Sequence, residues 1–438
     1  MRAFHFSWLG FFIAFFIWFA IAPLLSEIRT TLGLTKEEIW TSSIVGVGGT
    51  IFMRFLMGPV CDKFGPRIPF ACTLMFASIP TACTGTVTNA TTLAILRLFI
   101  GMAGGTFVMC QYWTSRMFTK SVVGTANAMV GGWGNLGGGV TQLVMGSALF
   151  PLFKELFKNE PNATELAWRW VSVVPAVVAF GIGVCLLLFS DDAPKGNYGE
   201  MKKNGTMADV SAAASFRSGA LNLNTWFMFI QYACCFGVEL TMNNAAALYF
   251  KDKFSLTTEE AAAIASIFGW MNLFARGMGG WFSDKANAKM GMRGRLWAQT
   301  IFLAAEGILV LVFANTASLT GAIVVMVFFS LFVQAAEGSS YGIVPYIDPP
   351  ATGSISGIIG AGGNTGAVAF GMGFRQLNYY DAFIIMGATI IASSFLSLFI
   401  CIPGCSRLIG GADDIPTKKD TLAVPTPDTD KVDDVNQA

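Results

Sequence analysis

Two arginines inside long apolar stretches are the residues most able to do chemistry in this sequence. Arg54 and Arg276 each begin the same pattern, with glycine four, aspartate eight and lysine nine positions later, and the copies are 222 residues apart. Because a helix rises about 1.5 Å per residue, eight residues place each guanidinium about 12 Å from the end of its helix. Half of the hydrocarbon of a bilayer is about 15 Å thick, so we expect both charges near the midplane.

Such charges need a partner. A charge at the midplane costs at least about 2.5–3.5 kcal/mol, and arginine does not deprotonate to avoid this cost. Two arginines at matching positions suggest an anion bound between them, and the planar guanidinium fork suits a planar oxyanion. Alternatively, each arginine pairs with a buried glutamate, for which Glu239, Glu306 and Glu337 are available. Arg97, a third embedded arginine, fits this structural interpretation best.

A second repeat places an asparagine in a glycine-rich stripe in each half of the chain. Stretches 124–139 and 353–366 carry glycine every three or four residues and superimpose at an offset of 229, which aligns Asn135 with Asn364. In lipid a glycine stripe lets two helix backbones approach closely, so packing alone explains the glycines equally well. An unpartnered amide in hydrocarbon is costly, which favours a substrate-facing role for the two asparagines.

Aromatic side chains are available to flank a flat anion. Tyr232 and Phe236 are one helical turn apart and therefore share a face, and Phe107 lies in another apolar segment. Plain packing is the commoner reason for such a pair in a chain with 39 phenylalanines, so this alternative stays open.

The composition is that of a polytopic membrane protein. The 438 residues are 54% hydrophobic and 13% charged, whereas about a quarter of a soluble domain is charged. Twelve apolar segments are each long enough to cross about 30 Å of hydrocarbon. They comprise residues 7–26, 39–60, 68–87, 91–117, 121–150, 167–189, 223–249, 260–282, 295–314, 318–341, 353–374 and 381–403. We therefore predict an all-α membrane protein with 12 transmembrane helices in two pseudo-symmetric six-helix bundles.

These segments divide the chain into an N-terminal bundle (1–189), a polar cytoplasmic central loop (190–222), a C-terminal bundle (223–403) and a disordered cytoplasmic tail (404–438). With the N-terminus inside, the inner loops and chain ends hold 17 lysines and arginines and the outer loops hold 8. The excess of positive charge on the inner side places both termini in the cytoplasm. We expect a multi-pass protein of the cell membrane, embedded in the lipid bilayer.

Several functional classes are disfavoured. A net charge of +1 gives no reason to expect a nucleic-acid partner. The nine cysteines are scattered without a CxxC spacing and are interpreted as small buried hydrophobes. The only histidine, His5, lies near the N-terminus, which argues against a histidine-built metal site and a buried histidine proton relay. No nucleophile–base pair is evident, so we expect neither an enzyme nor a metal or other cofactor.

Two short motifs resemble those of a known superfamily. The loop Asp62-Lys-x-Gly-Pro-Arg67 and the Arg97-x-x-x-Gly101 segment resemble the helix 2–3 and helix 4 signatures of the major facilitator superfamily. Membership would imply 12 helices around a central cavity, in agreement with the two repeats.

The two glycine stripes resemble the signature of one particular transporter family. Stretches 124–139 and 353–366 resemble the paired nitrate signature of the nitrate/nitrite porter family. Segments 4–23 and 236–241 resemble its eukaryotic high-affinity nitrate transporter branch, and the resemblance extends from residue 4 to about residue 403.

The resemblance implies nitrate as the substrate, with nitrite possible, and it assigns site residues. The implied substrate-clamping residues are Arg54 and Arg276, the signature asparagines are Asn135 and Asn364, and the cavity positions are Phe107, Tyr232 and Phe236. Some plant members need a small single-span accessory subunit. The central loop and tail are short beside those of many members, which leaves that partner open.

Uptake of an anion requires a driving ion. Moving one negative charge into a cell at about −100 mV costs about 2.3 kcal/mol. Without an embedded histidine a carboxylate must carry the proton, and Glu239 lies one turn beyond Phe236. We therefore expect nitrate:proton symport by alternating access, with the anion clamped between Arg54 and Arg276. The alternatives are a nitrate/nitrite exchanger of the same fold and a nitrate receptor without appreciable flux.

Overall fold

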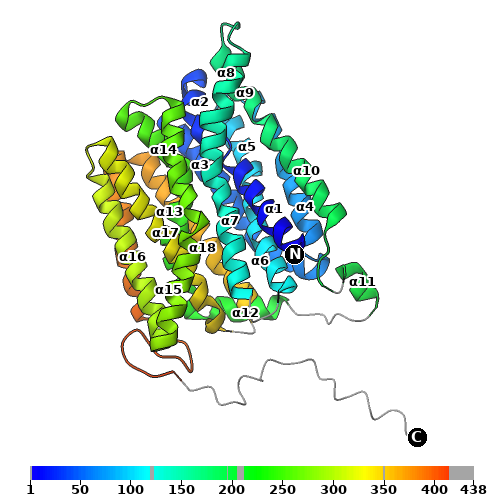
Figure 1. Cartoon of the computed structure of the whole chain (residues 1–438), viewed down its shortest axis with the longest axis vertical. Coiled ribbons are helices and arrows are strands. Elements are labelled where there is room, and N and C mark those ends of the chain that lie inside the picture. Colours follow the sequence, from blue (N-terminus) through cyan, green and yellow to red (C-terminus); the bar gives the residue numbers. More distant parts are fainter. Residues whose placement is uncertain (1, 119–122, 195, 205–211, 349–350, 414–438) are drawn as a thin grey trace.

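The computed structural model describes residues 2–118, 123–194, 196–204, 212–348 and 351–413. In this part of the chain the regular elements are helices, packed roughly side by side along the long axis of the molecule (Figure 1). The N-terminus and helices α11 and α12 lie at one end of the bundle, and α2 and α8 lie at the opposite end (Figure 1). We call the end that carries α2 and α8 the outer end, following the predicted orientation.

The helices follow the predicted order. The first half comprises α1 (Arg2–Trp18), η1 (Ala22–Leu24), α2 (Leu25–Leu32), α3 (Lys36–Phe64), α4 (Arg67–Ala82), η2 (Cys83–Thr86), α5 (Ala90–Gly101), η3 (Met102–Gly105), α6 (Thr106–Met117), α7 (Val123–Thr141), the π-helical η4 (Gln142–Leu149), α8 (Phe150–Leu156), α9 (Ala163–Val171) and α10 (Val173–Phe189). The central connection contains α11 (Tyr198–Lys203) and α12 (Ala212–Leu221). The second half comprises α13 (Leu223–Phe254), α14 (Thr258–Trp270), η5 (Met271–Leu273), α15 (Ala275–Met290), α16 (Met292–Ala314), α17 (Leu319–Ile347), α18 (Thr352–Gln376), α19 (Tyr379–Ser394) and η7 (Phe395–Leu398).

Nine helical stretches among the described residues are long and apolar enough to cross a membrane. The three other predicted spans are also helical and correspond to α13, to α14 with α15, and to α18. α13 and α18 are long, but they carry buried amides, a buried carboxyl group or closely spaced glycines, whereas α14 and α15 are short helices of 13 and 16 residues. These helices carry most of the predicted site residues.

Matching helix caps precede the two predicted site arginines. Thr35 begins α3 with a capping box to Glu38, and Thr257 begins α14 with the same box to Glu260. In a capping box the threonine side chain and the glutamate side chain each satisfy a free backbone N–H of the first turn. Thr35 and Thr257 are 222 residues apart, as are the two arginines. Each arginine therefore follows its cap by the same number of residues.

Ion pairs between the two halves close the outer end. In each pair one side chain comes from the first half and the other from the second half. The pairs are Arg29–Asp252 at 3.1 Å, Lys251–Glu27 at 2.5 Å, Lys154–Glu259 at 3.5 Å and Arg375–Glu37 at 3.6 Å. Because these side chains are partly exposed, each pair contributes little on its own. As a set they hold the outer end of one half against that of the other.

The stretch 404–413 contacts the start of α16. The Arg293 backbone N–H donates to Ser406 Oγ at 2.9 Å, and the Met292 N–H donates to an Asp413 carboxylate oxygen at 3.0 Å. The rest of the predicted disordered tail, residues 414–438, lies outside the described residues.

The repeated glycines are points of close helix packing. A Cβ atom added to Gly137 of α7 would collide with the Phe12 carbonyl of α1, and one added to Gly366 of α18 would collide with the Ala233 carbonyl of α13. These two glycines occupy matching positions of the repeated stretches. The packing interpretation of the stripe therefore holds in both halves.

Gly366→Ala tests this packing. The added methyl group overfills a close contact, which typically costs about 1–3 kcal/mol, so we expect a lower melting temperature and a lower yield of folded protein. Gly373→Ala on the same helix is the control, because an added Cβ there meets nothing within 4 Å. Thermal unfolding of both purified variants measures the effect, and equal melting temperatures would contradict the close contact.

Candidate anion-binding site

Arg54 of α3 is buried with only part of its hydrogen-bonding capacity used. Its side chain is 2% exposed, and Nη1 donates to the Gly360 carbonyl of α18. The guanidinium carbon lies 4.7 Å from the Phe107 ring centre and 5.0 Å from that of Phe236. Two rings at this distance stabilise a cation electrostatically. Among the described residues Nε and Nη2 have no hydrogen-bond partner, which leaves two donors for an oxyanion.

Arg276 of α15 is buried with a carboxylate partner. Nη1 lies 2.5 Å from Glu337 Oε2 of α17, and Nη2 donates to the Tyr232 hydroxyl of α13 at 3.0 Å. The interpretation of a buried arginine paired with a buried glutamate therefore holds for Arg276. It does not hold for Arg54, which has no ion pair among the described residues.

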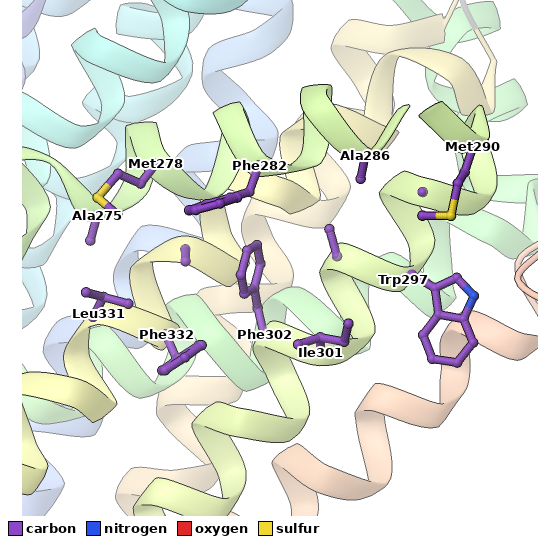
Figure 2. A pocket seen from close by; sticks show the side chains of 13 residues that line it. Ala275, Met278, Phe282, Ala286, Met290, Trp297, Ile301, Phe302, Leu331 and Phe332 are labelled. Carbon is purple, nitrogen blue, oxygen red and sulfur yellow. The ribbon is translucent and has the colours of Figure 1, made fainter. Parts of the chain in front are cut away.

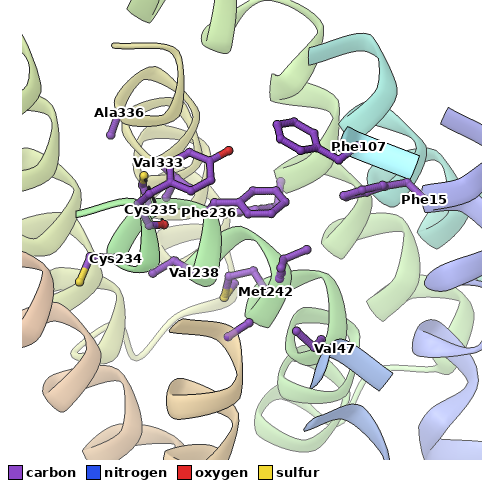
Figure 3. Close-up of a cluster of buried hydrophobic side chains, with 14 of the residues drawn as sticks. Phe15, Val47, Phe107, Cys234, Cys235, Phe236, Val238, Met242, Val333 and Ala336 are labelled. Atoms are coloured by element: carbon purple, nitrogen blue, oxygen red, sulfur yellow. Dashed lines mark hydrogen bonds between the residues drawn. The ribbon is translucent and has the colours of Figure 1, made fainter. Parts of the chain in front are cut away.

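A stack of aromatic rings joins the two arginines. Tyr232 and Phe236 stack at 5.3 Å and 22°, and Phe107 lies at 6.4 Å and 28° from Phe236 on its other side. Figure 3 shows Phe107 and Phe236 facing each other from opposite halves of the protein. Because Arg54 contacts Phe236 and Arg276 bonds to Tyr232, the stack forms one wall between the two charges. The structure thus brings together all three predicted aromatic residues.

Each arginine lies against a repeated glycine of the opposite half. A Cβ added to Gly360 would lie 3.2 Å from Arg54 Nη1, and one added to Gly131 would lie 3.6 Å from Arg276 Nε. Gly131 and Gly360 occupy the same position in the repeated stretches. Glycine at this position lets the backbone of one half approach the guanidinium of the other. The glycine-rich repeat of each half therefore contacts the repeated arginine of the opposite half.

The two signature asparagines lie one helical turn beyond these glycines and differ in their partners. Asn135 and Asn364 are fully buried. Asn135 Nδ2 donates to Glu239 Oε2 at 3.3 Å. Neither the oxygen nor the nitrogen of the Asn364 amide has a hydrogen-bond partner among the described residues. A buried amide without partners is destabilising, so Asn364 has the more available side chain of the two.

Glu239 of α13 accepts hydrogen bonds from two amides. Besides Asn135, Asn272 Nδ2 of η5 donates to Glu239 Oε1 at 2.9 Å. The oxygens of both amides are buried without partners among the described residues. Glu239 and Glu337 both lie close enough to Arg276 to interact with its charge. The two carboxyl groups and the arginine therefore form one electrostatic cluster.

Three residues of this cluster were not assigned to the site from the sequence. The sequence offers Glu337 as an arginine partner and as a proton carrier in place of Glu239, and it gives no role to Asn272 or Tyr341. The Tyr341 ring lies 5.4 Å from that of Tyr232 and 6.1 Å from that of Phe107. The available signal was polar residues within apolar spans, since Glu337 and Tyr341 are four positions apart and share a helix face.

A further cavity among the described residues does not resemble an anion site. A cavity of about 410 Å³ lies between α15, α16 and α17 (Figure 2). It is lined by Ala275, Met278, Phe282, Ala286, Met290, Gly294, Trp297, Ala298, Ile301, Phe302, Leu331, Phe332 and Ala335. Apart from the indole N–H of Trp297, these side chains are apolar, and none carries a charge that could hold an anion. In the described part of the chain no group of three or more His, Cys, Asp or Glu side chains is arranged to hold a metal ion.

Comparisons with known proteins define the class of protein. The Major Facilitator Superfamily model matches residues 7–372, so the chain belongs to this superfamily of transporters, which are not enzymes. A solved bacterial homologue of the human lysosomal transporter Spinster has the same fold, with a TM-score of 0.65 and 15% identity over 90% of this chain and 94% of that one.

Within the superfamily the chain belongs to the high-affinity nitrate transporters. It is 40% identical to High affinity nitrate transporter 2.5 of Arabidopsis thaliana over 92% of this chain and 80% of that protein. It is 27% identical to the Nitrate/nitrite transporter NrtP of Picosynechococcus over 84% of this chain and 83% of that protein.

Glu337→Ala tests the buried ion pair. The variant leaves the Arg276 charge buried without its closest counter-ion, which typically costs about 3–5 kcal/mol, so the melting temperature should fall by several degrees. The double variant Arg276→Met with Glu337→Met removes both charges and should be more stable than Glu337→Ala. Thermal unfolding in detergent compares them, and a Glu337→Ala protein as stable as the wild type would refute a stabilising ion pair.

Proposed function

We propose that this protein is a nitrate:proton symporter that binds the anion between Arg54 and Arg276, with nitrite as a second substrate. The observation that carries the proposal is the pair of unpartnered donors on buried Arg54, beside an aromatic wall that leads to Arg276. A planar oxyanion engages two guanidinium donors at once, and the rings exclude water from its faces. The relatives' names, which include nitrate and nitrite, support the choice of anion.

The charges of the cluster support coupling to a proton. With both carboxyl groups ionised, the charges of Glu239 and Glu337 balance those of Arg54 and Arg276. A bound nitrate adds one negative charge in a buried place, and uncompensated buried charge is costly. One proton taken up with the anion restores neutrality.

Glu239 is the residue we assign as the proton carrier. Glu337 is held by Arg276 at 2.5 Å, whereas Glu239 accepts hydrogen bonds from two neutral amides and lies beside the Glu337 carboxyl. Rotation of the Asn135 or Asn272 amide would turn an unpartnered oxygen toward Glu239 and accept a hydrogen bond from its protonated form. The site can therefore hold Glu239 with or without its proton.

The same proposal covers the membrane and the transport cycle. The two halves rock about the central cluster during alternating access. The protein lies in the cell membrane, and both termini face the cytoplasm. A nitrate/nitrite exchanger would need no proton carrier. A nitrate receptor would bind nitrate without transporting it at an appreciable rate. Transport measurements on the variants below distinguish these functions.

Arg54→Lys and Arg276→Lys test the clamp. An ammonium group keeps the charge but cannot form the bidentate contact, so each variant should fold and lose most nitrate binding. Binding of labelled nitrate to the purified proteins measures the effect, with Arg375→Lys as a control because Arg375 is paired with Glu37 at the outer end. Affinity within twofold of the wild type in either central variant would remove that arginine from the site.

Glu239→Gln tests the coupling. The amide mimics the protonated carboxyl, so nitrate binding and nitrate-for-nitrate exchange should persist, while accumulation driven by a proton gradient should be lost. Vesicles loaded with unlabelled nitrate report both activities when labelled uptake is followed with and without the gradient. Glu306→Gln is the matched control, because Glu306 is also fully buried but makes no hydrogen bond among the described residues.

Retention of gradient-driven accumulation by Glu239→Gln would show that the proton travels elsewhere. Loss of exchange together with accumulation would place Glu239 in the anion site or in the structural core. Exchange without any proton dependence in the wild type would support the exchanger.

A further inference from the structure

Arg97 of α5 is a buried cation held only by neutral groups. Its side chain is 3% exposed. Nη1 donates to Ser43 Oγ at 2.6 Å and to Ser42 Oγ at 3.3 Å, and Nη2 donates to Asn244 Oδ1 at 2.5 Å. Among the described residues Arg97 forms no ion pair, in contrast to Arg276. The sequence favours a structural Arg97 with a glutamate partner, whereas its partners in the structure are hydroxyls and an amide.

Arg97 lies on the outer side of the central cluster. Its partner Ser43 precedes Arg54 by 11 residues on α3, which corresponds to about 16 Å along the helix toward the outer end. An anion that enters from the outer end therefore passes the level of Arg97 before it reaches Arg54.

One partner of Arg97 belongs to the opposite half. Ser42 and Ser43 lie on α3 of the first half, whereas Asn244 lies on α13 of the second half. A small cavity of about 10 Å³ adjoins this contact and is lined in part by Ser43, Thr241 and Asn244. That volume holds about one water molecule, so this cavity has no room for an anion.

Separation of the two halves at the outer end changes the surroundings of Arg97. The ion pairs that close this end would break together with the bond from Arg97 to Asn244. Nη2 would then lose its acceptor and face the aqueous opening, with Ser42 and Ser43 still beside the guanidinium. A cation with free donors and no carboxylate nearby attracts small anions.

We propose that Arg97, with Ser42 and Ser43, forms a second, outer anion-binding site that takes nitrate before transfer to Arg54 and Arg276. The inference rests on the proposed transport function and adds a site on the path. Asn244 replaces the anion as the partner of Arg97 when the outer end closes. This displacement frees the anion from Arg97 for transfer to Arg54 and Arg276.

The test compares Arg97→Gln with Asn244→Ala in the full-length protein in sealed vesicles, with nitrate varied on each side in turn. Loss of a charge-assisted hydrogen bond of about 1.5–3 kcal/mol predicts that Arg97→Gln raises KM at the outer end about tenfold or more, with KM at the inner end within about twofold. Asn244→Ala removes the contact between the halves but keeps the cation. It should slow transport, because no amide then displaces the anion, and should leave the outer KM within about twofold of the wild type.

Equal effects of the two variants would show that Arg97 acts only as a contact between the halves and would overturn the proposal. An unchanged outer KM in Arg97→Gln would also overturn it. If Arg97→Gln fails to fold, Arg97→Lys replaces it. The retained charge should keep anion binding at the outer end, so any rise in KM should be confined to that side. A KM raised equally on both sides would contradict an outer site. A wild-type protein that does not transport nitrate would instead refute the proposed function.

Discussion

The burial of positive charge in hydrocarbon is the constraint on which this structure depends. Arg54, Arg97 and Arg276 are each at most 3% exposed, and arginine keeps its charge in any surroundings. The protein stabilises the three in different ways. Arg276 has the carboxylate of Glu337, Arg54 has two aromatic faces and a backbone carbonyl, and Arg97 has hydroxyls and an amide. Arg54 and Arg97 form no ion pair within the described part of the chain and therefore have most to gain from an anion.

Close backbone approach makes a shared site between the halves possible. Gly360 of the second half borders Arg54 of the first, and Gly131 of the first half borders Arg276 of the second. A larger side chain at either glycine would separate the guanidinium from the opposite helix. Because both contacts cross between the halves, any rocking of one half on the other alters the surroundings of both charges at once.

The repeat is symmetric in its cations and asymmetric in its carboxylates. The arginines, glycines and asparagines occur in both halves, but Glu239 and Glu337 both lie in the second half. Asn135 consequently donates a hydrogen bond to Glu239, whereas its counterpart Asn364 has no hydrogen-bond partner among the described residues. The symmetric residues suit a small anion that contacts both halves, and the asymmetric carboxylates suit a proton held on one side.

The sequence by itself determined the helical membrane fold, the two repeats and the shared depth of Arg54 and Arg276, because hydropathy and spacing along a helix are local properties. It also supplied the family, through motifs that are contiguous in the chain. Only the tertiary structure decided that Glu337 rather than Glu239 pairs with Arg276, and that Arg97 has neutral partners. These choices depend on the rotation and offset of helices far apart in the chain. Spacing within one helix does not fix its register against another, so the partner of a buried charge emerges only when the helices pack.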